Sequence, residues 1–444
     1  MQAVDLAICA RWVIPVEPSG LVLENHALVV NQGRVLALVP AEALRSQFEP
    51  QRQLERPEHV LLPGFVNAHT HAGATVLRGI AEDLPLERWL RGVIWPLEQR
   101  WVDPEFVRDG TELAIAGMLA SGTTCFAEMY LFPESTAAAA SRMHIRACVG
   151  LPVVDAATAW AQSSDEYITK GVALHDEYRD DPLVTTAFAP HAPYTVCDAT
   201  LARIRRAADE IELPVAMHLH ESQHEIEQAV ASTGERPLQR LERLGLANPL
   251  LCAIHMTQVT ESDLDLAARR AIHVVHCPQS NLKLGAGISP VAAMLARGIN
   301  VALGTDGPTS NNDFDMLDEM RTAALLAKGS SNDATVLDAH TVLRMATLKG
   351  AQALGLADVT GSLSIGKWAD CVCIDLGGIQ TQPVYDPTGA VLYAAARSEV
   401  SDVWVAGKAV VADGHLLRSD VGELLDRARA WTRRIAAADG ETRT

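Results

Sequence analysis

The sequence predicts an α/β protein built on a TIM-type (β/α)8 barrel, with shorter β-rich segments at both ends of the chain. Between about residues 60 and 360, short apolar runs alternate with longer amphipathic stretches rich in Ala, Glu and Arg. There are eight such runs in roughly 300 residues, the number that a (β/α)8 barrel needs. Polar and ionisable residues also mark the carboxyl ends of many runs, where barrel enzymes place their active sites. A doubly wound open sheet is the alternative, and this last observation favours the barrel.

Composition and charge narrow the classes of protein to consider. The 444 residues suit one large domain and a smaller one, and 48% of them are hydrophobic, enough for a large core. We expect neither a membrane span nor a signal peptide, because no long uncharged apolar run and no basic N-terminal segment occur. The net charge of −18 argues against nucleic acid and anionic membranes as partners. The eight cysteines form no Cys-x-x-Cys motif, as expected for reduced thiols of a cytoplasmic protein.

Both ends of the chain have the character of short β-strands. Near the N-terminus, apolar and β-branched stretches cover residues 5–16, 27–32 and 34–40, with Gly33 at a turn. The C-terminal part shows the same character at residues 369–376 and 400–414. These segments contain no long amphipathic stretch between their apolar runs, so we expect them to lie outside the barrel.

The eight apolar runs of the middle segment are the predicted barrel strands. They cover residues 60–69, 123–129, 145–153, 183–191, 213–221, 250–256, 271–278 and 299–306. Helix-like stretches separate most of them, for example residues 198–212 and 263–270. This alternation is the order of repeated βα units around a parallel sheet.

The ends of these runs carry a set of residues suited to a metal. His69 and His71 end the first run and face the same side of a strand, because side chains at i and i+2 do so. Later runs end in or near His191, His218 with Glu221, His255 and Asp306. If the runs are neighbouring strands, these groups meet at one mouth, where three imidazoles and a carboxylate form a catalytic zinc-type site. Each residue alone also has a structural explanation, such as a hydrogen-bonded core histidine or, for Asp306, a helix N-cap.

Several short motifs resemble a known group of enzymes. The strings "PGFVNAHTHA", "HLHE", "AIH" and "GTDG…SNN" resemble the amidohydrolase superfamily over nearly the whole chain. Within it, "LRGIAEDLPLERWL", "HAPYTV", "SNLKLGAGISPV" and "LGTDGPTSNND" are similar to the deaminases of 5′-methylthioadenosine and S-adenosylhomocysteine. Related triazine hydrolases and guanine-type deaminases share several of these strings.

The resemblance implies a single divalent metal and a set of residues around it. The implied ligands are His69, His71, His218 and Asp306. Glu221 would donate a proton to the purine ring nitrogen. His255 would orient the attacking water and, with Asp306, help move its proton. Zn²⁺ is the expected ion, and Fe²⁺ suits the same ligands. Superfamily members with two metals bridge them through a lysine at a strand end, and the middle runs here contain none.

The resemblance also implies substrate contacts. Glu98 would bind the ribose hydroxyls, His191 the purine edge, Trp89 would line the pocket and Ser310 would add a polar contact. From the residues alone, Glu98 is equally understandable as a solvated helix acid and Trp89 as part of a core. The chain departs from the related pattern at Val149, where that pattern has an arginine, so the outer end of the substrate is held differently here.

These expectations combine into a fold and a function. The implied fold is a (β/α)8 barrel over residues 60–360 and a small β-sandwich made by residues 1–59 with 361–444, the latter including a terminal helix. The implied reaction is hydrolytic deamination of 5′-methylthioadenosine, S-adenosylhomocysteine or adenosine to the inosine analogue and ammonia. The partner is then a small purine nucleoside, and we expect a homodimer or homotetramer.

Two alternatives to this function remain at this point. One is a triazine or guanine-type aminohydrolase that uses the same metal site, and Glu98 is the residue that discriminates it from a nucleoside deaminase. The other is a non-catalytic relative, which is disfavoured because every ligand position holds a residue able to bind a metal.

Overall fold

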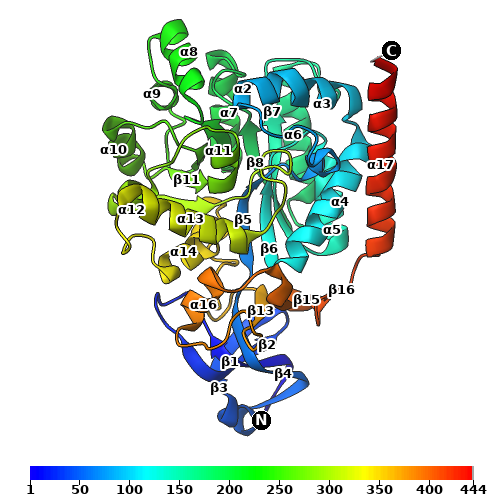
Figure 1. The fold of residues 1–444 in the computed structure, drawn as a ribbon, viewed down its shortest axis with the longest axis vertical. Coiled ribbons are helices and arrows are strands. Elements are labelled where there is room, and N and C mark those ends of the chain that lie inside the picture. Colours follow the sequence, from blue (N-terminus) through cyan, green and yellow to red (C-terminus); the bar gives the residue numbers. More distant parts are fainter. Residues whose placement is uncertain (443–444) are drawn as a thin grey trace. The chain divides into compact units, whose positions relative to one another are not determined.

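A computed structural model describes residues 1–442 and contains the predicted strand–helix alternation (Figure 1). The eight barrel strands are β5 (Phe65–Thr70), β6 (Thr123–Glu128), β7 (Arg146–Val153), β8 (Val184–Pro190), β9 (Val215–Leu219), β10 (Leu251–His255), β11 (His273–His276) and β12 (Asn300–Leu303). Seven of the predicted runs contain one strand each, and the first run overlaps all of β5 except Thr70, so the prediction of the strands is confirmed. Most of their residues are buried, which explains why they appear in the sequence as continuous apolar runs.

The barrel strands form one sheet in chain order, from β5 to β12. The pairs from β7 to β12 are parallel. A parallel bridge between Thr70 and Asp306, with the N–H of Asp306 donating to the carbonyl of His69 at 3.0 Å, brings the last segment back to the first strand. The sheet is therefore a nearly closed barrel rather than an open doubly wound sheet, as predicted.

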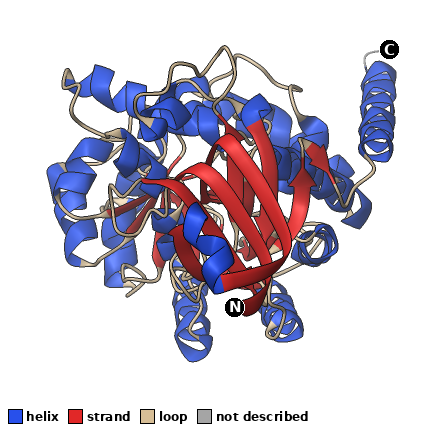
Figure 2. Ribbon diagram, turned by 90° about the horizontal axis from the view of Figure 1, so that it is seen from below, coloured by secondary structure: helices blue, strands red, loops and turns tan. Residues whose placement is uncertain are grey.

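Helices connect the barrel strands and follow the last of them (Figure 2). They are η2 (Ala72–Leu77), α2 (Leu86–Trp89), η3 (Leu90–Ile94), α3 (Trp95–Trp101), α4 (Pro104–Ala120), α5 (Pro133–Met143), α6 (Ser164–Tyr178), α7 (Asp198–Ile211), α8 (Gln223–Thr233), α9 (Pro237–Arg243), α10 (Glu261–Arg269), α11 (Pro278–Lys283), α12 (Val291–Ala296), α13 (Met316–Ser331), α14 (Ala339–Met345) and α15 (Leu348–Ala353). Ser163, Ser222 and Thr260 begin α6, α8 and α10 as N-caps, each accepting a backbone N–H three residues on.

A second eight-stranded sheet contains strands from both ends of the chain. Its order is β16 (His415–Leu416), β15 (Lys408–Ala412), β14 (Val400–Val405), β13 (Cys371–Asp375), β4 (Phe48–Pro63), β1 (Gln2–Val13), β2 (Leu23–Asn31) and β3 (Arg34–Pro40). Along β1, Leu6 and Ile8 join one apolar core, while Ala7 and Cys9 join another. Because side chains alternate along a strand, both faces of this sheet are covered.

The remaining helices are η1 (Ala41–Ala43), α1 (Leu44–Gln47), α16 (Pro387–Tyr393), η4 (Arg397–Glu399) and α17 (Val421–Thr442).

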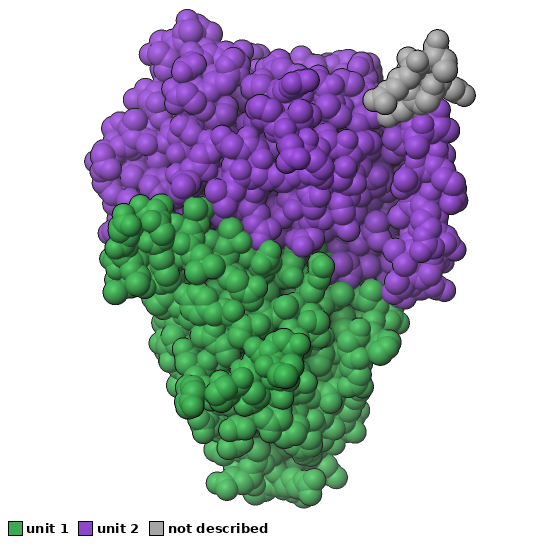
Figure 3. Space-filling model, in the orientation of Figure 1, with its two compact units in different colours: residues 1–68, 118–125, 315–418 green, residues 69–117, 126–314, 419–444 purple. Residues whose placement is uncertain are grey.

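The chain divides into two compact units, which are residues 1–68 with 118–125 and 315–418, and residues 69–117 with 126–314 and 419–444 (Figure 3). All the predicted site residues belong to the second unit.

The terminal helix α17 packs within the second unit, against α4. The indole of Trp431 donates to Oδ2 of Asp109 at 2.9 Å, and its ring lies 5.3 Å from that of Phe106, edge to face. Arg427 donates to the same aspartate at 2.7 Å. A buried aromatic ring and a shared carboxylate therefore hold the helix in place.

A buried ion pair links two strands of the second sheet. Arg56 of β4 donates two hydrogen bonds of 2.7 Å to Asp402 of β14, whose side chain is fully buried. Burial acts to raise the pKa of Asp402, but the hydrogen bonds from Arg56 and Ser401 outweigh it and hold the pKa below its ordinary value.

None of the described helices is long and apolar enough to cross a membrane. All eight cysteines are free, and all but Cys197 are buried, in agreement with the expectation of reduced core thiols.

Candidate metal centre and active site

Seven of the ten predicted site residues lie at or just beyond the carboxyl ends of the barrel strands. His69 is in β5 and His71 follows its last residue; His191 follows β8 in the same way. His218 is in β9 and His255 ends β10. Glu221 lies just beyond β9 and Asp306 just beyond β12. Parallel strands of a barrel end at one face, so residues far apart in the sequence converge there.

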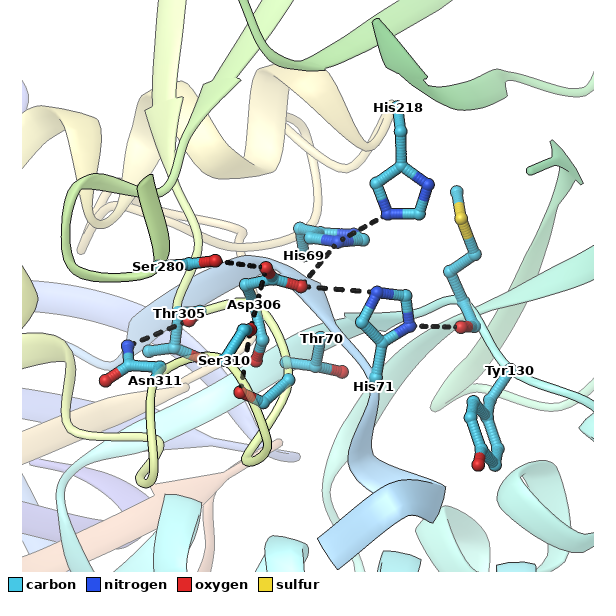
Figure 4. A network of polar contacts seen from close by, with 12 residues as sticks. His69, Thr70, His71, Tyr130, His218, Ser280, Thr305, Asp306, Ser310 and Asn311 are labelled. Atoms are coloured by element: carbon cyan, nitrogen blue, oxygen red, sulfur yellow. Dashed lines mark hydrogen bonds and ion pairs between the residues drawn. The ribbon is translucent and has the colours of Figure 1, made fainter. Parts of the chain in front are cut away.

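Four of these residues form a compact group of metal-ligand type. One ligand atom from each of His69, His71, His218 and Asp306 lies within 4.8 Å of the others. Nε2 of His69 and Nε2 of His71 each lie 3.2 Å from Oδ1 of Asp306, and Nε2 of His218 lies 3.2 Å from Nε2 of His69. The three rings and the carboxylate point toward one another (Figure 4).

The other ring nitrogens fix two of these imidazoles. Nδ1 of His71 lies 2.6 Å from the carbonyl of Met129, and Nδ1 of His218 lies 2.8 Å from the carbonyl of His191. A carbonyl can only accept, so Nδ1 carries a proton in both rings and Nε2 is the nitrogen left to face a metal. This is the arrangement by which proteins orient histidine ligands of a metal.

The carboxylate of Asp306 has one oxygen satisfied and one left over. Oδ2 accepts hydrogen bonds from Ser280 at 2.6 Å and Ser310 at 2.9 Å. Oδ1 is buried and, among the described residues, has no hydrogen-bond partner of accepted geometry. A buried oxygen that faces three imidazole Nε2 atoms without a donor of its own fits a cation, and three nitrogens with one oxygen are a ligand set for Zn²⁺ or Fe²⁺.

A buried carboxylate that was not singled out from the sequence supports the segment that carries His69 and His71. Glu128, at the end of β6, accepts hydrogen bonds from the hydroxyl of Thr70 at 2.5 Å and from the N–H groups of Ala72 at 2.7 Å and Gly73 at 3.2 Å. It therefore holds the backbone on both sides of His71. The only clue in the sequence is an acid at the end of the second apolar run.

A cavity of about 1290 Å³ opens beside the four-residue group. Eight of the ten predicted site residues line it: His71, Trp89, Glu98, His191, His218, Glu221, His255 and Asp306. His69 and Ser310 are not among the lining residues. The volume exceeds the lower end of the range for small-molecule sites several-fold, so a nucleoside with a sizeable substituent fits.

Glu221 and His255 face each other across the cavity floor. Oε1 of Glu221 lies 3.6 Å from Nε2 of His255, whose Nδ1 donates to Oδ1 of Asn281 at 2.9 Å. The ring of His255 stacks on that of His218 with centroids 5.5 Å apart. Burial raises the pKa of Glu221, and the nearby His255 only partly opposes this. A carboxyl group with a raised pKa is suited to donate and recover a proton.

Glu98 and His191 lie farther along the cavity wall. The hydroxyl of Tyr130 donates to Oε1 of Glu98 at 2.7 Å, and burial raises the pKa of this glutamate. The His191 ring packs edge to face against Trp95, and burial together with His71 and His69 lowers its pKa to about 4. His191 is therefore neutral and can offer both a donor and an acceptor.

We expected Trp89 to line the pocket and Ser310 to contact the substrate, and the structure gives each residue a further or different contact. Trp89 lines the cavity and also packs in an apolar cluster with Leu86, Ile94 and Leu284, so its pocket-lining and packing roles coincide. Ser310 is 1% exposed and donates to Asp306 instead of facing the cavity.

The related sequence pattern has an arginine at the position of Val149, and the structure shows where Val149 and the arginines near the cavity lie. Val149 is fully buried and does not line the cavity, and Arg146 is spent on the carbonyl of Pro182 at 2.7 Å. The arginines that do line it are Arg91, paired with Glu87 at 2.8 Å, and Arg240, paired with Asp198 at 2.6 Å.

A parallel barrel with a three-histidine, one-aspartate group at its carboxyl end defines a metal-dependent hydrolase. The chain belongs to the amidohydrolase family, whose model matches residues 60–410.

Named relatives cover nearly the whole chain. It is 46% identical to a 5-methylthioadenosine/S-adenosylhomocysteine deaminase of Teredinibacter turnerae, over 98% of each chain. A protein of the same name from Saccharophagus degradans is 44% identical over 98% of this chain and 97% of the relative. Among solved structures, an adenosine deaminase from Xanthomonas campestris with bound zinc is 51% identical, with a TM-score of 0.97 over 98% of this chain and 99% of the other. An atrazine chlorohydrolase from Arthrobacter aurescens, 22% identical with a TM-score of 0.90 over 96% and 99%, shares the fold.

Proposed function

We propose that the protein is a metal-dependent deaminase of adenine nucleosides that converts 5′-methylthioadenosine, S-adenosylhomocysteine or adenosine to the inosine analogue and ammonia. The observation that carries the proposal is the joint placement of a three-histidine, one-aspartate group and a buried glutamic acid, Glu221, on one nucleoside-sized cavity. The near-full-length similarity to deaminases of these nucleosides supports the same substrate class.

The four-residue group would hold the metal ion, through Nε2 of His69, His71 and His218 and through Oδ1 of Asp306. A divalent ion bound there lowers the pKa of water toward about 7 and so supplies a nucleophile at neutral pH. The hydroxyls of Ser280 and Ser310 keep the Asp306 carboxylate turned so that Oδ1 faces the imidazoles. We therefore assign Ser310 to positioning of this carboxylate.

The chain's own acids and bases would move the protons. The reaction adds water to the carbon that bears the amine, protonates the adjacent ring nitrogen and releases ammonia. Glu221, whose pKa is raised by burial, donates the proton to the ring nitrogen. His255 orients the attacking water. His255 and Asp306 take up a proton from this water and pass it to the amine, which leaves as ammonia. The hydrogen bond from His255 to Asn281 holds this ring in place.

Three residues of the cavity wall would bind the nucleoside. Glu98 accepts hydrogen bonds from the two ribose hydroxyls, while Tyr130 fixes its carboxylate from behind. The neutral His191 contacts the purine edge, and Trp89 supplies an apolar wall. Glu98 separates this function from a triazine or guanine-type aminohydrolase, whose substrates carry no sugar.

We further propose Zn²⁺ as the ion in the cell, with Fe²⁺ able to replace it. The zinc in the Xanthomonas campestris protein supports this choice. We propose a cytoplasmic homodimer or homotetramer that binds no nucleic acid, in line with the net charge of −18. We also propose, from the sequence, a catalytic barrel at residues 60–360 and a second domain made by residues 1–59 with 361–444.

The test is a comparison of substrates with purified protein of known metal content. Ammonia release is measured at several concentrations of 5′-methylthioadenosine, S-adenosylhomocysteine and adenosine, with guanine and a chlorotriazine as controls. We expect turnover of the nucleosides and none of the controls. Turnover of guanine or the chlorotriazine without turnover of any nucleoside would contradict the proposal.

A further inference from the structure

The turn after β9 carries the proposed proton donor. Among the described residues the carboxylate of Glu221 accepts no hydrogen bond, and its ion-pair contact, Nε2 of His255, is 3.6 Å away. No side-chain partner therefore sets the direction of this carboxylate. That direction depends on the backbone of residues 220 and 221.

This backbone has an unusual conformation. His220 has a φ of +53°, in the left-handed region that residues other than glycine rarely adopt. Such a conformation persists only where the surroundings enforce it, and it occurs preferentially at functional sites. The groups that hold residues 220 and 221 thus determine where the proton donor points.

Glu225, in the first turn of α8, holds both residues at once. Its Oε1 accepts the N–H of His220 at 3.0 Å and its Oε2 accepts the N–H of Glu221 at 2.7 Å. The side chain is buried, with 4% of the residue exposed. From the opposite side, the hydroxyl of Thr257 donates to the carbonyl of Glu221 at 2.7 Å. The turn is therefore clamped between a carboxylate and a hydroxyl.

Helix capping does not account for this glutamate. Ser222 already caps α8 by accepting the N–H of Glu225. In a capping box the acid at this position accepts the N–H of the capping residue itself, whereas Glu225 reaches back to the two residues before it. Burial raises the pKa of Glu225 to about 8, so keeping an ionised carboxylate here is unfavourable. Burying this carboxyl group is therefore unfavourable, which indicates that Glu225 has a role beyond capping the start of α8.

We propose that Glu225 is the positioning residue of the proton donor, which fixes the backbone of residues 220 and 221 and so aims the Glu221 carboxylate into the cavity. The inference rests on the proposed role of Glu221. Glu225 has both oxygens engaged by backbone N–H groups and acts through Glu221 rather than on the substrate.

The test is a double-mutant cycle of Glu225→Gln and Glu221→Gln, assayed with 5′-methylthioadenosine. Glutamine keeps the shape of residue 225 but turns an amide group toward one of the two N–H groups. We expect Glu225→Gln to lower kcat by about 10- to 100-fold, from the loss of one of the two backbone hydrogen bonds and the buried N–H group left unpaired, with bound metal unchanged and KM little affected. In the Glu221→Gln background, Glu225→Gln should lower kcat no further, because the donor that it positions is already absent.

Two control variants separate positioning from stability. Ser222→Ala removes the helix cap and should lower Tm without changing kcat. Glu227→Gln removes an exposed acid of the same helix, which accepts a hydrogen bond from Gln223, and should change neither. If Glu225→Gln does not fold, Thr257→Val replaces it in the cycle, and Thr257→Ser, which keeps the hydroxyl, should restore kcat.

Three results would overturn the inference: a kcat of Glu225→Gln within about twofold of wild type, losses that multiply in the double variant, or a rise in KM alone. These differ from a failure of the proposed function. If Glu221→Gln itself keeps full kcat, the assignment of the proton donor falls, and the inference falls with it. If Glu221→Gln is impaired and Glu225→Gln is not, the inference alone falls.

Discussion

Glu98→Gln tests whether the cavity reads a sugar. In the structure Oε1 of Glu98 is engaged by the hydroxyl of Tyr130 at 2.7 Å, which leaves Oε2 as the oxygen best placed to accept from a ribose diol. Glutamine keeps one oxygen for Tyr130 but replaces the other with an NH₂ group. The substitution therefore removes the negative charge and one acceptor while it preserves the shape of the side chain.

The size of the effect follows from the bond that is lost. A hydrogen bond to a charged group contributes about 1.5–3 kcal/mol. Since about 1.4 kcal/mol corresponds to a factor of ten, we expect kcat/KM for the nucleoside to fall by about 10- to 150-fold. If the contact is equally strong in the ground state and the transition state, KM rises and kcat hardly changes; if it also positions the purine, kcat falls too.

The assay compares kcat/KM for 5′-methylthioadenosine and for the free base adenine, in wild type and in Glu98→Gln. Glu87→Gln is the matched control, because Glu87 is a nearby acid that pairs with Arg91 and does not line the cavity. In Glu98→Gln, kcat/KM should fall for the nucleoside and stay unchanged for the free base. Equal losses for both compounds, or no loss for either, would refute the assignment of Glu98 to the ribose and favour the triazine or guanine-type alternative.

Three further predictions concern the metal, the proton donor and stability. His218→Ala should lose bound metal and activity together, as measured by metal analysis and ammonia release, whereas the exposed His224→Ala should keep both. Glu221→Gln should keep its metal but lower kcat by roughly 10²–10⁴, the usual contribution of general acid catalysis; a variant with wild-type kcat would exclude Glu221 as the donor. Arg56→Met leaves the buried Asp402 unpaired and should cost about 3–5 kcal/mol at pH 7 in chemical denaturation. The folded-state pKa of Asp402 is lowered, so the ion pair stabilises the fold at pH values above the unfolded pKa of about 3.9. The difference in the free energy of unfolding between wild type and variant should therefore shrink as the pH falls below that value. A difference that stays constant with pH would count against the ion pair.

The barrel and the grouping of His69, His71, His218 and Asp306 at its carboxyl end could be predicted because their causes are local in the sequence. A strand buried on both faces needs a continuous apolar run, and all eight runs are present. The polar groups stand at the ends of these runs because that is where the sheet opens to the cavity. The spacing of two between His69 and His71 also predicts that their side chains point to the same face of the strand.

The supporting groups could not be predicted, because their partners lie far away in the chain. Glu128 holds the loop around His71, 57 positions earlier, and Tyr130 holds Glu98, 32 positions earlier. Glu128 ends an apolar run and Tyr130 follows it, but nothing in the sequence indicates the partner of either residue. Ser310 shows the same limit, because a hydroxyl near a site looks alike in the sequence whether it faces the substrate or a ligand carboxylate.

The strained backbone at three strand ends connects the fold with the chemistry. His220, His255 and Asp306 have φ values of +53°, +76° and +62°, and each such conformation costs on the order of 1–3 kcal/mol for a residue other than glycine. Buried hydrogen bonds hold each residue: Glu225 accepts the backbone N–H of His220, and Asn281 accepts from the ring of His255. At Asp306, Ser280 donates to the carboxylate and the backbone N–H donates to the carbonyl of His69. This strain was stored when the chain folded, before any substrate arrives. Glu221, which follows His220, and the side chains of His255 and Asp306 therefore face the cavity at fixed angles, and in the proposed reaction they would need little reorganisation.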